Sequence, residues 1–203
     1  MTRKFLDNVY EHIGEGVEAF YDKWAATYEA EVGENGYVTP TRCARLLAAH
    51  LPDLSAPVLD FGCGTGLSGL ALRAEGLSAL DGMDLSSEML TKAYGKGIYR
   101  ALQQIPDNAP PPFEAGDYAA IAAIGVIGPG AAPLDVFDTL TAKLTPGALL
   151  VLSFNDHALQ DPTYEAKIAT HVDNGTLRVL EQEHGQHLPA RNINSTVYLT
   201  EKL

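Results

Sequence analysis

The residues best suited to chemistry in this chain follow a short apolar run, in the stretch Val58-Leu59-Asp60-Phe61-Gly62-Cys63-Gly64-Thr65-Gly66. The apolar residues predict a buried strand, and residues Leu67 to Glu75 predict a helix that Gly76 ends. The alternating glycines between them predict a loop that turns tightly and lets a ligand approach the backbone. Because the first N–H groups of the helix point into this loop, the sequence predicts a polar cradle for a ligand.

Two kinds of ligand could fit the cradle, depending on the register in which the glycines are read. Gly64, Gly66 and Gly69 spell the G-x-G-x-x-G of dinucleotide sites. That register would run the strand through Gly62 and place Asp60 beside a pyrophosphate, anion against anion. The register D-x-G-x-G-x-G instead sets a carboxylate beside a cationic or amine-bearing ligand. S-adenosylmethionine has an amino group, a sulfonium charge and no phosphate, so we expect it here; a plain turn is the remaining alternative.

A second acid stands at the end of the next predicted strand, Ser78 to Met83. Asp84 follows Gly66 at close to the ~20-residue spacing of a ribose-binding acid after a nucleotide loop. A carboxylate at this strand end can accept hydrogen bonds from both ribose hydroxyls. Ser86 is well placed to cap the helix that follows.

These motifs resemble a known family. The pattern D-x-G-x-G-x-G is similar to the first motif of the class I S-adenosylmethionine-dependent methyltransferases. The segment Gly82-Met83-Asp84-Leu85-Ser86-Ser87-Glu88-Met89-Leu90 resembles the family's G-h-D-h-S-x-x-M-L segment, where h is apolar. The resemblance implies that Asp84 holds the ribose and that Leu85 and Met89 lie beside the adenine. The cofactor contacts expected in the first motif are Asp60, Gly62, Cys63, Gly64 and Gly66.

An aromatic segment near the start extends the resemblance. Residues Val17 to Val32 predict one amphipathic helix with its aromatic residues on one face. Part of it is similar to the Y-D-x-W-A-x-x-Y segment that precedes the core in many small-molecule methyltransferases. The resemblance implies that Tyr21, Trp24 and Tyr28 contact the cofactor as a lid.

The chain departs from the family after the third predicted strand, Ile98 to Gln103. The family usually has an aspartate there that receives the adenine amine, and this chain has a proline at the aligned position. Gln104 or Asp107, on either side, could replace it. The apolar run Tyr118 to Val126 predicts a central strand buried on both faces. Ile124 and Gly125, at its carboxyl end, should border the methionine part of the cofactor.

The order of elements predicts one doubly wound α/β domain with a mostly parallel, seven-stranded sheet, the Rossmann-like methyltransferase fold. Residues 1–39 are expected to form the helical lid, and residues 56–203 the sheet core. The last two strands are expected at Leu177 to Glu183 and Thr196 to Thr200, as an antiparallel hairpin.

Composition narrows the partners. The chain has 203 residues, 46% of them hydrophobic, which suits one globular domain. Its formal net charge of −12 opposes binding to nucleic acid or to an anionic membrane. Two cysteines make no disulfide framework, no metal-ligand spacing is present, and the first residues lack the apolar run of a signal peptide. We therefore expect a cytoplasmic protein with a small-molecule methyl acceptor, no metal and no nucleic-acid or membrane partner.

The predicted activity is methyl transfer from S-adenosylmethionine to that small molecule. Such a transfer depends mainly on geometry and on exclusion of water. A base could assist; the candidates are Asp156, His184, His187 and His157, of which His157 is the first to test. Two other classes stay open: a non-catalytic S-adenosylmethionine-binding protein that regulates a partner, and a nicotinamide-dependent oxidoreductase.

Within the family, the bacterial and animal methyltransferase-like proteins of the Williams–Beuren-region type look closest. That similarity is carried by the lid segment and by Lys96-Gly97-Ile98-Tyr99. It does not identify the methyl acceptor.

Overall fold

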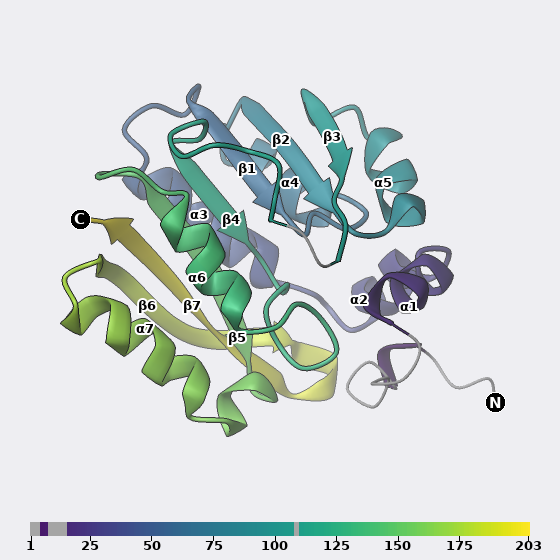
Figure 1. Ribbon diagram of the computed structural model, residues 1–203. Helices are drawn as coiled ribbons and strands as arrows, with labels where there is room; N and C mark the ends of the chain where they lie inside the picture. Colours follow the sequence, from purple (N-terminus) through teal and green to yellow (C-terminus); the bar gives the residue numbers. More distant parts are fainter. Residues whose placement is uncertain (1–4, 8–15, 108–109) are drawn as a thin grey trace.

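A computed structural model describes residues 5–7, 16–107 and 110–203 (Figure 1). Its centre is a seven-stranded sheet with strand order β3-β2-β1-β4-β5-β7-β6. The first five strands run parallel, and β7 pairs antiparallel with both β5 and β6. The strands are β1 Pro57–Phe61, β2 Ala79–Asp84, β3 Ala101–Gln104, β4 Ala120–Ala123, β5 Leu149–Asn155, β6 Leu177–Leu188 and β7 Ile193–Lys202. The expected mixed sheet with a C-terminal antiparallel hairpin is therefore confirmed.

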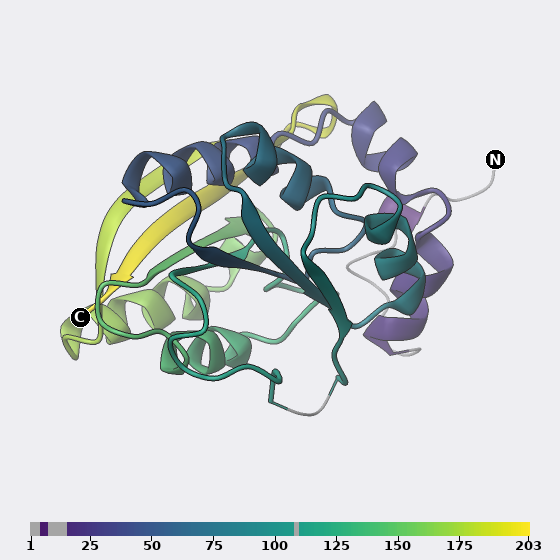
Figure 2. The same ribbon diagram turned by 90° about the horizontal axis from the view of Figure 1, so that it is seen from above.

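Helices cover both faces of the sheet. Seen from above, α3 and α4 lie on one side of the sheet and α6 and α7 on the other (Figure 2), while α1 and α2 stand at the end near α5. The helices are η1 Phe5–Asp7, α1 Val17–Trp24, α2 Tyr28–Glu34, α3 Thr39–His50, α4 Leu67–Ala74, α5 Ser87–Tyr94, α6 Asp135–Ala142, η2 Ala158–Gln160, α7 Thr163–Asp173 and η3 Pro189–Arg191. In the described part of the chain, every helix is too short or too polar to cross a membrane.

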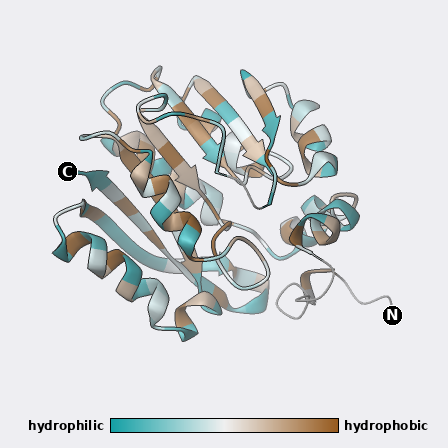
Figure 3. Cartoon of the chain, in the orientation of Figure 1, coloured by the Kyte–Doolittle hydropathy of each residue, from teal (hydrophilic) through white to brown (hydrophobic). Residues whose placement is uncertain are grey.

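The core divides according to the two-residue period of the strands. In β1, Val58 packs into the cluster under α3 and α4, whereas Leu59 and Phe61 pack into the cluster under α6 and α7. The outer helices α6 and α7 alternate between hydrophobic and hydrophilic residues, as expected for helices half covered by a sheet (Figure 3). Both faces of β1 are thus buried, which fixes the strand and the loop that leaves it.

The N-terminal segment differs from the expected single helix. Helix α1 ends at Trp24, the N–H of Thr27 turns back to the Trp24 carbonyl, and α2 then starts at Tyr28. The break lets the Glu31 carboxylate accept hydrogen bonds from the Thr27 hydroxyl at 2.7 Å and from the Leu6 N–H at 3.0 Å. The predicted lid, residues 1–39, falls partly on residues outside the described ranges.

Two strands are shorter than the apolar runs that predicted them. Strand β4 stops at Ala123, because Gly125 turns with a φ of 69° and its N–H bonds to the side-chain hydroxyl of Ser153 on β5, not to a backbone carbonyl of that strand. Strand β3 starts only at Ala101, because Tyr99 turns inward beneath the first strand. The last hairpin, in contrast, is longer than expected, since β6 extends to Leu188.

Candidate functional site

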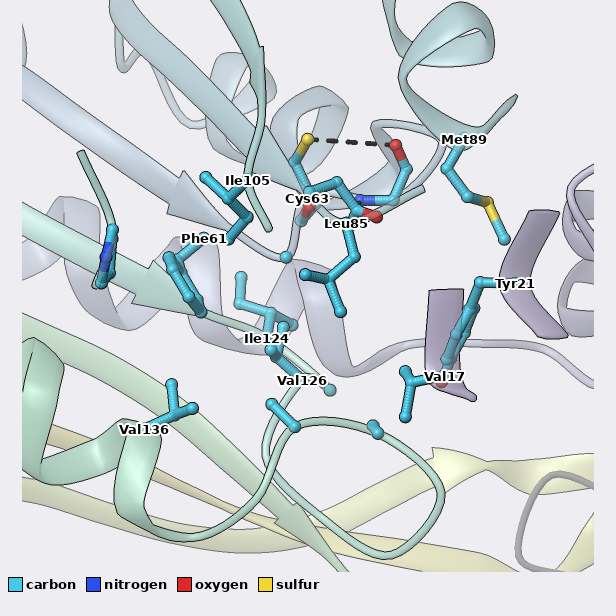
Figure 4. Close-up of a pocket in the computed structure, with 18 of the residues that line it drawn as sticks. Val17, Tyr21, Phe61, Cys63, Leu85, Met89, Ile105, Ile124, Val126 and Val136 are labelled. Atoms are coloured by element: carbon cyan, nitrogen blue, oxygen red, sulfur yellow. Dashed lines mark hydrogen bonds between the residues drawn. The ribbon is translucent and has the colours of Figure 1, made fainter. Parts of the chain in front are cut away.

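A cavity of about 370 Å³ lies where the carboxyl ends of β1, β2 and β4 meet (Figure 4). This main cavity is bounded by the glycine loop after β1, the start of α5, the loop before α6 and the inner side of α1. In an open parallel sheet this edge is where ligands bind. The predicted cofactor contacts that line it are Tyr21, Tyr28, Gly62, Cys63, Gly64, Asp84, Leu85, Met89, Asp107 and Ile124.

Four predicted contacts do not line the main cavity. Trp24 is buried within the lid, and Gly66 lies behind the loop, where its N–H bonds to the Cys63 carbonyl. Gln104 turns away and donates a hydrogen bond to the Leu85 carbonyl at 2.9 Å. Asp60 is 1% exposed and lies beneath the glycine loop. Of the two candidates for the adenine amine, only Asp107 therefore reaches the cavity wall.

The glycine loop is held against β2 by its own backbone. The N–H groups of Gly62 and Cys63 both donate to the Met83 carbonyl, at 2.8 and 3.0 Å. Gly62 has a φ of 68°, and a Cβ there would lie 2.4 Å from the Val126 side chain, so another residue would strain the turn and collide. A Cβ on Gly64 would meet nothing within 4 Å, which leaves that backbone open to a ligand.

Asp84 connects this loop to the next helix. One carboxylate oxygen, Oδ2, accepts the Gly64 N–H at 2.8 Å, and the other, Oδ1, accepts the Ser86 N–H at 2.9 Å. Burial raises the pKa of this carboxyl, and the backbone donors act in the opposite direction. The Ser86 hydroxyl caps α5 through the Met89 N–H, as predicted. Each Asp84 oxygen keeps acceptor capacity toward the cavity.

The charge of the main cavity has one sign. Among the described residues that line it, three are acidic and none is Lys, Arg or His. The three are Asp84, Asp107 and Asp135. Cys63 also lines it, but burial raises its thiol pKa well above the ordinary value, so it is not a thiolate nucleophile. Three carboxylates without a basic side chain favour a ligand with positive charge and disfavour a pyrophosphate.

A buried network supports the loop from below. The Oδ2 atom of Asp60 accepts hydrogen bonds from the Ser68 and Tyr99 hydroxyls, each at 2.6 Å, while its Oδ1 has no partner among the described residues. Burial raises the pKa of Asp60 to about 6. Gly69 on α4 makes room for the tyrosine ring, since a Cβ there would lie 2.2 Å from the Tyr99 oxygen. The third glycine of the dinucleotide-like register therefore faces Tyr99.

Helices α1 and α2 are tied to the rest of the site by polar contacts. The Asp22 carboxylate on α1 accepts a hydrogen bond from the Ser86 hydroxyl at 2.5 Å. Lys96, after α5, donates both to Glu29 on α2 at 2.5 Å and to the Thr65 carbonyl in the glycine loop at 2.7 Å. The lid thus contacts the two segments that form the cofactor-facing wall.

The lid interior is aromatic. The Trp24 ring packs edge-on against Tyr28 with a centroid distance of 4.8 Å, and Phe20 and Trp24 are 3% and 2% exposed. Figure 4 shows Met89, Tyr21 and Val17 at the same end of the cavity, with the Tyr21 ring directed toward Val17. Burial and the nearby Asp84 charge raise the Tyr28 pKa, so its hydroxyl stays protonated at neutral pH. Trp24 supports the lid from inside, whereas Tyr21 and Tyr28 face the ligand space.

A second, smaller cavity of about 80 Å³ adjoins the first, and we refer to it as the side chamber. Tyr21, Tyr28, Tyr37, Gly125 and Ala131 line both. The side chains with a polar atom that line only the side chamber are those of Trp24, Ser153, Asn155 and His187.

The structure separates the four base candidates. His187 lines the side chamber, whereas His157, placed first from the sequence, lines neither cavity. Asp156 bonds to the Asn194 N–H, and His184 bonds to the Thr196 hydroxyl on the outer hairpin. Of the four candidates, only His187 therefore lines a cavity.

Sequence reasoning missed Tyr37, which stands with Gly125 at the junction of the two cavities. A Cβ on Gly125 would lie 2.6 Å from the Tyr37 oxygen, so this glycine lets the tyrosine approach the end of β4. The available indication was a lone aromatic residue just before the Thr39-Pro40 helix start. Its meaning depends on the contact with β4, which lies far away in the sequence.

The mostly parallel sheet, the glycine loop and the acidic cavity at the strand ends define a Rossmann-like α/β protein whose cavity suits a phosphate-free nucleoside ligand. Residues 34–197 match the family described as "Methyltransferase domain", so the chain belongs to the methyltransferase domain family. The resemblance of its motifs to class I S-adenosylmethionine-dependent methyltransferases is confirmed.

Two curated relatives match over part of their length. Human methyltransferase-like protein 27 is 33% identical over 154 residues, covering 74% of this chain and 62% of that protein. The 18S rRNA (guanine(1575)-N(7))-methyltransferase of Saccharomyces cerevisiae is 32% identical over 126 residues, covering 55% of this chain and 46% of that protein. The match thus spans less than two thirds of either relative.

Solved structures show the same fold at lower identity. A chain from the complex of the Haloferax volcanii Trm112 methyltransferase activator with a methyltransferase has a TM-score of 0.68 and 18% identity, covering 92% of this chain and 97% of that one. A TehB-like S-adenosylmethionine-dependent methyltransferase from Corynebacterium glutamicum has a TM-score of 0.65 and 18% identity, covering 91% and 99%.

Proposed function

We propose that this protein is an S-adenosylmethionine-dependent methyltransferase that acts on a small molecule. The observation that carries the proposal is the charge of the main cavity: carboxylates and open glycine backbone, with no basic side chain among the described lining residues. A nicotinamide dinucleotide would bring a pyrophosphate into this acidic space. A sulfonium-bearing nucleoside matches it.

The residues present fit the cofactor in three parts. Asp84 would accept the ribose hydroxyls: it lines the cavity, and backbone donors hold both of its oxygens. Leu85, Met89 and Asp107 would form the adenine surface, with Asp107 for the exocyclic amine. The open Gly64 backbone and Ile124 would border the methionine part.

Bound S-adenosylmethionine supplies a methyl group already activated by the sulfonium charge. The protein's contribution is then to bind, to orient and to keep water out. Tyr21 and Tyr28, held by the buried Trp24, would cover the site. Asp60 would act from beneath, by holding Ser68 at the start of α4 and thus the loop.

The acceptor is proposed to be a small molecule, not RNA, although the yeast relative is named for an rRNA base. The ligand space lies beneath two lid helices, and the net charge of −12 opposes a polyphosphate chain. Both cysteines are free and buried, which suits the reducing cytoplasm proposed for the protein.

The test begins with isothermal titration of S-adenosylhomocysteine and S-adenosylmethionine, with NADH as the competing ligand. We expect either methionine-derived ligand to bind and to raise the melting temperature by linkage. Methyl-labelled S-adenosylmethionine is then incubated with a protein-free metabolite extract, and label should appear in a small molecule. Binding of NADH alone would refute the cofactor; cofactor binding without any transfer would favour the regulatory, non-catalytic alternative.

A further inference from the structure

The side chamber holds a chain of hydrogen bonds that reaches His187 from the interior. The His187 Nδ1 atom lies 2.8 Å from the Thr39 hydroxyl, which lies 3.0 Å from the Ser195 hydroxyl. Arg42 Nη1 donates to the same Ser195 oxygen at 3.0 Å. Thr39 and Ser195 are 0% exposed, so these groups have no solvent to satisfy them.

The direction of this chain follows from counting protons. Arginine only donates, so the Ser195 oxygen accepts from Arg42, and the Ser195 proton goes to Thr39. The Thr39 proton then goes to Nδ1 of His187, which acts as the acceptor. The reverse direction would leave the buried Ser195 hydroxyl proton without an acceptor among the described residues. In the neutral ring, Nε2 therefore carries the hydrogen.

The Nε2–H group is the free end of that chain. The ring lines the side chamber and packs edge-on against Tyr37 with a centroid distance of 5.1 Å. The ring makes its side-chain hydrogen bond to the described residues through Nδ1, which leaves Nε2 available to an occupant of the chamber. Burial lowers the pKa of His187 to about 4, so the ring is neutral at physiological pH and a weak base. Its role is thus to donate a hydrogen bond, not to remove a proton.

The other described residues that line the side chamber carry no formal charge; its polar groups are hydroxyls, the Asn155 amide and the indole N–H of Trp24, which has no hydrogen-bond partner among the described residues. An ion in such a space would lose its hydration without gaining a counterion. The volume of about 80 Å³ is roughly half of the ~150 Å³ cavity that holds a benzene ring. The occupant must be small, uncharged and able to accept a hydrogen bond.

We propose that the side chamber is the subsite for one end of the methyl acceptor, and that it selects an uncharged hydrogen-bond-accepting group there through the Nε2–H of His187. This group positions the acceptor without being the atom methylated. The proposal rests on the proposed function, because the chamber adjoins the main cavity at Tyr37 and Gly125. The acceptor class is then a neutral hydroxyl, carbonyl or ring-nitrogen compound, not a carboxylate, phosphate or ammonium at the inserted end.

The test uses three probes of nearly equal shape: acetamide, acetate and acetamidinium. Each is titrated into protein saturated with S-adenosylhomocysteine, and binding is followed by saturation-transfer NMR of the probe methyl group. Acetamide should bind at least about tenfold more tightly than either ion, since an unpaired charge in this space costs more than one decade. Equal or tighter binding of acetate or acetamidinium would overturn the proposal, and this comparison needs no variant.

Substitutions of His187 test whether acetamide binds in the side chamber. His187→Leu should weaken acetamide binding about tenfold, and His187→Gln, whose amide can donate, should recover most of it. The matched control is His184→Leu on the same strand, where the histidine bonds to Thr196 outside both cavities. Full acetamide binding by a folded His187→Leu protein would refute the assignment.

The affinity for S-adenosylhomocysteine, measured on every variant, separates this proposal from the function. It should change less than about twofold in His187→Leu, because the ring lines only the side chamber. Absence of cofactor binding in the unaltered protein would refute the proposed function. Cofactor binding without selective acetamide binding would refute the subsite alone.

Discussion

The carboxylates of Asp84 and Asp60 both lie near the glycine loop, but their surroundings give them different roles. Asp84 accepts two backbone N–H groups and still faces the ligand space. Asp60 accepts two hydroxyls and is enclosed beneath the glycine loop. One can bind ligand directly, whereas the other can act only through the loop. We therefore make a separate prediction for each of these two aspartates.

Asp84→Ala should weaken binding of S-adenosylhomocysteine by about 1.5–3 kcal/mol, or one to two decades, because two charge-assisted hydrogen bonds to the ribose are lost. Isothermal titration measures this. The control is Asp81→Ala on the same strand, whose carboxylate pairs with Arg100 and does not line the cavity. Unchanged affinity in folded Asp84→Ala would remove the ribose assignment.

Asp60→Asn should change the pH dependence of stability. The pKa of Asp60 rises from its ordinary 3.8 to about 6, so the folded state holds the proton more tightly than the unfolded state. The contribution of this carboxyl to stability is therefore present below pH 4 and is lost as the pH rises through about 6. Because asparagine has no ionisable carboxyl, the stability of Asp60→Asn does not fall for this reason as the pH rises.

Urea denaturation between pH 4 and 7 tests the sign. The free energy of unfolding of the unaltered protein, minus that of Asp60→Asn, should fall by about 2–3 kcal/mol over this range. His187, whose lowered pKa has the opposite effect, is present in both proteins and cancels. A difference that is flat or rises with pH would show that the carboxyl is not held in its neutral form.

At the scale of elements, the site depends on how closely α4 approaches the segment before β3. Tyr99 reaches Asp60 only because Gly69 on α4 has no side chain; a Cβ would lie 2.2 Å from the tyrosine oxygen. Gly69→Ala should therefore destabilise the protein by about 1–3 kcal/mol through overpacking and displacement of Tyr99.

Gly33→Ala is the matched control for this substitution. Gly33 lies in α2, and a Cβ there would meet nothing within 4 Å. It should stabilise the protein by about 0.5–1 kcal/mol, because alanine loses less entropy in a helix. The midpoint of urea denaturation compares the two variants. Equal shifts for both would mean that the Tyr99 contact is unimportant.

The lid is the other element whose behaviour bears on function. Helices α1 and α2 bury Phe20 and Trp24 against Met89 of α5 and are joined to the core by a few polar contacts. Since a ligand in the main cavity would be covered by Tyr21 and Tyr28, we predict that the lid opens to admit it and orders afterwards.

Amide hydrogen exchange, measured with and without ligand, tests this prediction. Saturating S-adenosylhomocysteine should slow exchange across residues 17–32 and leave α7, which does not line the cavity, unchanged. Trp24 is the only tryptophan, so its emission should shift at the same ligand concentrations. Equal exchange with and without ligand would make the two helices a static wall.

For the whole molecule, net charge bears on whether the acceptor is the proposed small molecule or an RNA, the substrate class in the name of the yeast relative. The net charge of −12 repels phosphates at long range. In a filter-binding assay at about 0.15 M salt, ribosomal RNA should show no complex below roughly 0.1 mM protein, the weak end of non-specific affinities. Micromolar binding of rRNA would argue against a small-molecule acceptor.

The sequence by itself determined the sheet, the glycine loop, the Ser86 cap and the acid at the end of β2. Each of these is encoded locally: alternation of apolar residues, glycines at fixed spacing, a hydroxyl at a helix start. Local signals were therefore enough to predict the fold and the family, and ten of the fourteen predicted cofactor contacts line the cavity.

Only the tertiary structure decided which side chains face the ligand. Asp60 and Tyr99 stand far apart in the chain, and their hydrogen bond turns the carboxylate beneath the loop. His187 lines the side chamber because β6 extends to Leu188 and brings the histidine beside Tyr37 and Thr39. The physical reason is that burial and hydrogen-bond partners arise from contacts between distant segments, which no local pattern of residues records.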